Sequence, residues 1–169
     1  MSNLLKFEVR KHKAMRFIGK SVYFRDGHGC GDVWFHDVLQ ENCGWVFEKL
    51  DEMKEYASGI PNRGLLLTWD KHCDKTHLLG FTSGRFMKAD TPVPDGMDYF
   101  DVSEGYMGIG VFDDWEDGTH DQQVAEAIEQ TGEYTDASWR FMGELSYDND
   151  VGYLPPGGIA GYFNSCDKK

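Results

Sequence analysis

Residues 139–147 run Trp139-Arg140-Phe141-Met142-Gly143-Glu144-Leu145-Ser146-Tyr147, and this stretch decides how the chain is interpreted. Its three aromatic residues are typical of a β-strand. A carboxylate in such a strand has two ordinary positions. It faces water on the exposed side of a sheet, or it lies in an aromatic-lined pocket. In a pocket, Glu144 would bind a cation or would donate or accept a proton.

The segments before this strand predict strands and one long helix. Residues 6–10 and 15–24 show the period-two alternation of strands. From Asp32, apolar residues recur at helical spacing, which predicts an amphipathic helix of about 20–25 residues. Residues 65–69 and 77–84 then predict two strands of a hairpin around a polar turn.

The second half of the chain repeats this order of elements. We expect strands at 98–102 and 106–112, a short helix from about residue 119 to 130, the strand at 139–147 and a final extended piece within 157–163.

The repeated order predicts an α+β fold with an antiparallel sheet and one helix in each half. We expect one domain over residues 1–169, with pseudo-repeats at about 5–90 and 96–165. The two helices would cover one face of the sheet. The other face, or the seam between the halves, would form a concave surface.

Composition narrows the function classes. The net charge of −12 argues against binding of nucleic acid or of anionic membrane surfaces, which requires clustered Lys and Arg. It is compatible with cationic ligands. The chain has 11 Phe, 8 Tyr and 5 Trp, which supply core area and can line pockets for flat ligands.

The sequence indicates a cytoplasmic protein without a membrane anchor. No apolar segment approaches the ~20 residues of a membrane span, and residues 1–5 lack the pattern of a signal peptide. None of the four cysteines forms a C-x-x-C pair, and the group His72-Cys73 with His77 fits no zinc pattern. We therefore expect no metal site and no cofactor, and a homodimer remains open.

Four motifs, taken in order, resemble the GyrI-like small-molecule-binding domains. They are Gly80-Phe81-Thr82-Ser83-Gly84, Val93-Pro94-Asp95-Gly96-Met97, Val102-Ser103-Glu104-Gly105-Tyr106 and Glu144. This family includes the effector-binding domains of AraC-type and multidrug-sensing regulators. The resemblance extends over roughly Phe7 to Tyr147. The first predicted strand follows Met1 closely, so we expect a stand-alone form.

The resemblance implies duplicated β-α-β-β (SHS2-like) modules with a ligand cleft at the pseudo-twofold seam. It also implies that Glu144 lies in an aromatic pocket and meets lipophilic or cationic aromatic compounds. Such a pocket suits flat, weakly hydrated cations, because ring faces attract cations. The predicted ligand-binding residues are Glu144, Trp69, Tyr106, Phe81, Trp139, Phe141 and Tyr147.

Three functions follow from the resemblance: binding or sensing of small molecules, hydrolysis of reactive cyclopropane-containing xenobiotics, and modulation of a protein such as DNA gyrase. We favour binding. As a hydrolase, the chain would use Glu144 as general acid or base, with Tyr106 as a hydrogen-bond donor.

The family commonly has Glu-x-Tyr at this strand, whereas this chain has Glu144-Leu145-Ser146-Tyr147. Residues i and i+3 of a regular strand face opposite sides, so Tyr147 would point away from Glu144 unless a bulge intervenes. The partner of Glu144 is therefore expected on another strand, with Tyr106 and Trp69 as the first candidates.

Overall fold

The structure, a computed structural model, describes residues 2–25, 44–60, 63–68, 78–114, 118–146, 158 and 160–169. Two helices lie in these ranges, the helical segment 44–51 and α3 (His120–Gln130), and a short 3-10 turn η1 (Lys54–Tyr56) follows the first. The strands are β1 (Leu4–His12), β2 (Met15–Arg25), β3 (Arg63–Thr68), β4 (Leu78–Lys88), β5 (Asp98–Val102), β6 (Gly105–Phe112), β7 (Tyr134–Asp136), β8 (Met142–Ser146) and β9 (Ala160–Lys168).

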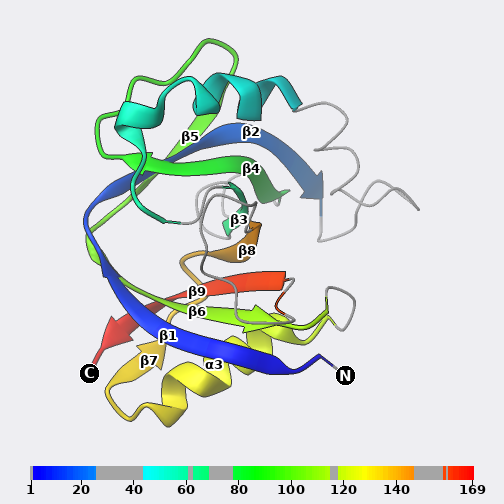
Figure 1. The fold of residues 1–169 in the computed structure, drawn as a ribbon, viewed down its shortest axis with the longest axis vertical. Coiled ribbons are helices and arrows are strands. Elements are labelled where there is room, and N and C mark those ends of the chain that lie inside the picture. Colours follow the sequence, from blue (N-terminus) through cyan, green and yellow to red (C-terminus); the bar gives the residue numbers. More distant parts are fainter. Residues whose placement is uncertain are drawn as a thin grey trace.

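The described strands form one sheet with antiparallel pairings. Its order is β1-β6-β9-β8-β3-β4-β2-β5, and β7 pairs with the end of β9. Strands that follow each other in sequence are not always neighbours, since β1 pairs with β6 and β2 pairs with β5. The helical segment 44–51 and α3 lie at opposite ends of the molecule, each beside the strands of one half of the sheet (Figure 1). The predicted antiparallel α+β fold is confirmed.

Both helices pack on the same face of the sheet. In the segment 44–51, Val46 and Leu50 join a buried cluster with Ile18. In α3, Val124 lies against position 110 of β6. The strand register shows that Ile18 and Gly110 lie on the same face. On the first half of the sheet Ile18 lies opposite Arg85, and Ser83, two residues from Arg85 on β4, lies opposite Leu65. The pairs then continue from Leu65 to Glu144, from Glu144 to Tyr162 and from Tyr162 to Gly110. Residues directly opposite each other in antiparallel strands share a face.

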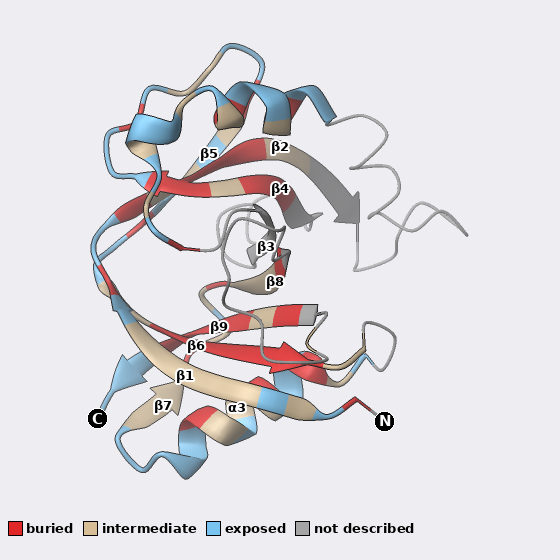
Figure 2. Cartoon of the chain, viewed as in Figure 1, coloured by how far each residue is buried: buried red, intermediate tan, exposed pale blue. Residues whose placement is uncertain are grey.

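The close approach of α3 to β6 depends on two glycines. A Cβ at Gly108 would lie 2.6 Å from the Cγ1 atom of Ile128, and one at Gly110 would lie 2.9 Å from the Cγ2 atom of Val124. The helix therefore occupies the space that side chains on β6 would need. The burial colouring shows that β6 is buried over most of its length beside α3 (Figure 2).

The opposite face of the sheet is filled by a buried apolar cluster that includes Phe17, Phe86 and Phe163. The rings of Phe86 on β4 and Phe163 on β9 lie 5.4 Å apart, edge to face. In a flat sheet these strands would be three spacings, or about 14 Å, apart. The sheet therefore bends around this cluster. Among the described residues this face is core, so an open site is to be sought on the face that carries the helices.

The strand predicted at 139–147 begins later than expected, because β8 covers only Met142–Ser146. Residues 138–140 form a turn instead. Ser138 donates its hydroxyl and its backbone N–H to Asp136 Oδ2, at 2.6 and 3.3 Å. Such local side-chain acceptors compete with strand pairing. The prediction was therefore wrong for the first residues of this stretch.

The other predicted elements agree with the structure to different degrees. The short helix predicted at about 119–130 is confirmed as α3, and the final extended piece continues beyond the predicted residues to Lys168 as β9. The long helix predicted from Asp32 is helical at 44–51, and its earlier part lies outside the described residues. In the described part of the chain, no helix is long and apolar enough to cross a membrane.

Candidate functional site

Glu144 lies on β8, one of the two central strands, and faces the side of the sheet that carries the helices. Its side chain is neither fully buried nor fully exposed. Directly opposite on β9 is Tyr162, whose hydroxyl donates a hydrogen bond to Glu144 Oε1 at 3.3 Å. The partner of the glutamate is thus a tyrosine of the neighbouring strand.

Two further rings surround the phenol of Tyr162. The imidazole of His120 stacks on it, with ring centroids 4.1 Å apart and an interplanar angle of 4°. The ring of Phe112 lies nearly perpendicular to both others, with its centroid 5.7 Å from that of Tyr162 and 4.6 Å from that of His120. These rings come from β9, α3 and β6, so the tertiary fold brings them together.

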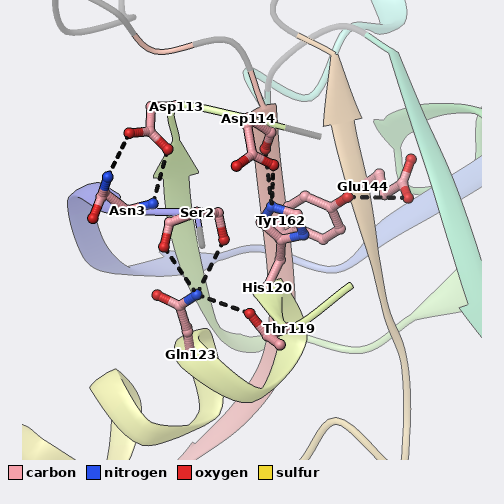
Figure 3. A network of polar contacts seen from close by, with 9 residues as sticks. All are labelled: Ser2, Asn3, Asp113, Asp114, Thr119, His120, Gln123, Glu144 and Tyr162. Carbon is pink, nitrogen blue, oxygen red and sulfur yellow. Dashed lines mark hydrogen bonds and ion pairs between the residues drawn. The ribbon is translucent and has the colours of Figure 1, made fainter. Parts of the chain in front are cut away.

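His120 is held by Asp114, which follows β6 (Figure 3). Its Nε2 lies 2.9 Å from the backbone oxygen of Asp114 and 4.0 Å from Asp114 Oδ1. A carbonyl oxygen only accepts hydrogen bonds, so Nε2 carries a hydrogen and donates it. The side chain of His120 is 1% exposed, which makes this bond its anchor in a water-poor environment.

The chemistry of Tyr162 follows from its position. Burial raises the pKa of the Tyr162 hydroxyl far above its usual value, and the negative charge of Glu144 raises it further. The phenol therefore stays protonated at physiological pH and remains a hydrogen-bond donor to the carboxylate. The pair thus combines the carboxylate of Glu144 with a hydrogen-bond donor, the phenol of Tyr162.

The N-terminal residues contact Asp113 and the start of α3 (Figure 3). Asn3 donates its backbone N–H to Asp113 Oδ1 at 2.8 Å and its side-chain amide to Asp113 Oδ2 at 2.7 Å. These bonds lower the pKa of Asp113. Gln123 of α3 donates to the hydroxyl groups of Ser2, at 3.1 Å, and Thr119, at 3.0 Å. The start of β1 is thus tied to the start of α3.

The predicted site residues do not all lie together. Tyr106 is four residues from Gly110 along β6, or about 13 Å from the position opposite Tyr162. Phe141 is buried in the core on the opposite face, and Trp139 is 63% exposed in the turn before β8. Trp69 and Tyr147 lie outside the described residues. Phe81 lies on β4 opposite Leu67, and its side chain is not described.

Tyr106 and Phe141 line a different cavity of about 150 Å³. It lies where β5 and β6 are connected, and His12, Arg140 and Cys166 also line it. Glu144 is not among its lining residues. The described residues contain no cluster of three or more His, Cys, Asp and Glu side chains that could hold a metal ion.

Sequence reasoning did not find Tyr162 and His120. Tyr162 belongs to the final extended piece that was predicted, but its partner strand was unknown. His120 follows Thr119 at the expected helix start and has no motif around it. For Tyr162, the sequence contains one signal: the alternation in Gly161-Tyr162-Phe163-Asn164 places Tyr162 and Phe163 on opposite faces of a strand.

No model of a known family matches the chain, and no curated protein matches it in sequence. Solved structures are similar to it. The structure of SAV2435 bound to tetraphenylphosphonium has a TM-score of 0.61 and 9% identity, over 98% of this chain and 94% of that chain. A hydrolase encoded by lin2189 from Listeria innocua has a TM-score of 0.52 and 12% identity, over 96% of this chain and 92% of that chain. At these identities the likeness shows the fold alone.

Proposed function

We propose that the chain binds lipophilic aromatic cations at the seam of its sheet, with Glu144 as the opposite charge. The observation that carries this proposal is the pairing of Glu144 with Tyr162 on the central strands, on the face between the two helices. The phenol of Tyr162 lies beside the carboxylate, and the buried rings of His120 and Phe112 pack on that phenol. This site combines one negative charge with an aromatic residue.

The strand order supports a duplicated fold with its seam at this site. The elements β2, segment 44–51, β3 and β4 have the same order as β6, α3, β8 and β9, apart from the short strand β7 that follows α3. In each set the last strand lies in the middle, as β2-β4-β3 and β6-β9-β8. The two sets meet where β3 pairs with β8. Under this proposal Glu144 lies beside the pseudo-twofold axis.

The charge and size of the ligand follow from the surroundings of Glu144. A cation beside a half-buried carboxylate gains charge complementarity, and a large, weakly hydrated cation loses little water on entering such a site. Ring faces add about 0.5–2 kcal/mol each for a cation placed over them. The net charge of −12 adds long-range attraction. Trp69, Phe81 and Tyr147 remain predicted members of the aromatic wall.

The comparison with SAV2435 supports the choice of probe. That protein has a similar fold and was solved with tetraphenylphosphonium, a lipophilic aromatic cation. The matched probe is tetraphenylborate, which has nearly the same size and shape and the opposite charge. Comparing the two ions separates the effect of charge from the effect of apolar contact.

The test is calorimetric titration of both ions into wild type, Glu144→Gln and Glu104→Gln. Glu104 is the matched control, because it is an exposed carboxylate outside the site and its loss changes the net charge equally. We expect Glu144→Gln to weaken tetraphenylphosphonium binding about tenfold or more, or ~1.4 kcal/mol, and Glu104→Gln to have little effect. Tetraphenylborate should bind weakly throughout. Equal losses in the two variants would contradict the proposal.

Hydrolysis of a reactive, cyclopropane-containing compound is the second candidate function. It is favoured by the contact between a carboxylate and a protonated phenol, and a hydrolase is among the proteins with a similar fold. Glu144 would take a proton from water as the water oxygen bonds to a ring carbon. The broken C–C bond would leave its electron pair on a conjugated carbonyl oxygen, which Tyr162 would stabilise and a proton would neutralise. Product formation that is lost in Glu144→Gln would establish this activity.

A further inference from the structure

His120 is a buried residue whose place in the molecule the proposed cation site does not explain. It is the first residue of α3, and its imidazole lies flat against the phenol of Tyr162. On the other side it donates a hydrogen bond to the backbone of Asp114, at 2.9 Å. It therefore links Asp114 to the ring that contacts Glu144.

The hydrogen bond between Tyr162 and Glu144 is sensitive to the orientation of the phenol ring. Its O···O distance of 3.3 Å is longer than the ~2.7 Å of a typical O–H···O bond. A further displacement of about 0.3 Å would reach the ~3.6 Å at which such a contact no longer counts as a hydrogen bond. Whatever fixes the ring plane of Tyr162 thus decides whether the contact forms.

The contacts around Tyr162 show which residues fix its ring plane. Parallel stacking at 4.1 Å prevents the phenol from tilting toward His120, and Phe112 packs nearly perpendicular to both rings. Since Asp113, the neighbour of Asp114, accepts two hydrogen bonds from Asn3, the imidazole has a fixed support. Contiguous contacts lead from the N-terminal segment to Glu144 (Figure 3).

We propose that His120 is a positioning residue of the Glu144 site, which acts by holding the Tyr162 hydroxyl on the carboxylate. This inference rests on the proposed cation-binding function for its effect on a ligand. His120 does not itself touch the ligand; it acts through Tyr162, so removal of either residue should have the same consequence at Glu144.

A double-mutant cycle with tetraphenylphosphonium tests this. We expect His120→Leu and Tyr162→Phe each to weaken binding by a similar factor, roughly three- to tenfold. The double variant should bind no worse than Tyr162→Phe alone, because both changes remove the same hydrogen bond between Tyr162 and Glu144. Losses that multiply in the double variant would overturn the proposal.

Two further variants distinguish loss of the stacking contact from general damage to the fold. His120→Phe retains a flat ring against Tyr162 but loses the hydrogen bond to Asp114, so it should weaken binding clearly less than His120→Leu does. A loss as large as that of His120→Leu would overturn the role of stacking. Ile128→Val changes another buried residue of α3, one that packs on β6, and should leave binding unchanged.

A ligand-free measurement separates this inference from the proposed function. In NMR spectra with ¹³C-labelled tyrosine, the Tyr162 ring signals are assigned by their loss in Tyr162→Phe. The stacked imidazole should shift them upfield, and the shift should vanish in His120→Leu and persist in Ile128→Val. Unchanged Tyr162 signals in His120→Leu would overturn the positioning role. Failure of the wild type to bind tetraphenylphosphonium would instead overturn only the proposed function.

Discussion

Replacing Gly108 by alanine should destabilise the protein, because α3 leaves no room for a side chain on β6 at this position. The new Cβ would lie 2.6 Å from Ile128 Cγ1 and 2.7 Å from Ile128 Cδ1, whereas ordinary contacts begin at 3.4 Å. Ile128 would have to retreat by almost 1 Å, and it is fully buried. Overpacking of this kind costs about 1–3 kcal/mol, and a cost of about 2 kcal/mol lowers Tm by about 4–8 °C for a chain of this size.

Urea unfolding and thermal unfolding measure this effect against a matched glycine. Gly44 lies exposed in the helical segment 44–51, and a Cβ there would meet nothing within 4 Å. Gly44→Ala should therefore stabilise the protein, by up to about 1 kcal/mol. In an Ile128→Ala background both clashing atoms are gone, so Gly108→Ala should lose most of its cost. If Gly108→Ala were as stable as wild type, or its cost were unchanged by Ile128→Ala, α3 would not pack on β6 as described.

Three other predictions follow from single side chains. Burial raises the pKa of Cys166 to about 11, so alkylation at pH 8 followed by peptide mass spectrometry should find Cys166 unmodified until the protein is unfolded. The hydrogen bonds from Asn3 lower the pKa of Asp113 below 3.8, so their contribution to stability is present above that pH and is lost as the pH falls below it. The difference in unfolding free energy between wild type and Asp113→Asn, measured by urea unfolding, should therefore be constant near neutral pH and shrink in acid. Because the pKa of Tyr162 is raised by burial, Tyr162→Phe should leave the absorbance titration of the folded protein near pH 10 unchanged, and a missing tyrosine transition there would contradict the burial of the phenol.

Local sequence patterns predicted the elements because apolar residues recur with the period of the strand or helix that they form. The period-two alternation at 6–10 and 15–24 marked β1 and β2, and the apolar stripe of the helix at about 119–130 marked α3. The turn at 138–140 was missed because its stability comes from Asp136, outside the aromatic stretch that suggested a strand. A local acceptor outweighed the strand propensity of Trp139 and Phe141.

Strand pairing could not be predicted in the same way. The pattern that makes β1 a strand is equally suited to several neighbours, and its actual partner β6 begins more than ninety residues later. The same holds for β8 and β9, whose pairing places Tyr162 opposite Glu144. Partner choice depends on how whole layers pack, which no short window of sequence contains.

The sequence by itself determined that the chain is an antiparallel α+β protein, that Glu144 lies in a strand, and that Tyr147 is in the wrong register to serve it in a regular strand. Only the tertiary structure decided that Tyr162 is the partner of Glu144 and that His120 supports it. The physical reason is that alternation and helical periodicity are properties of one segment, whereas a contact between β8, β9 and α3 exists only after three segments distant in sequence share one buried face.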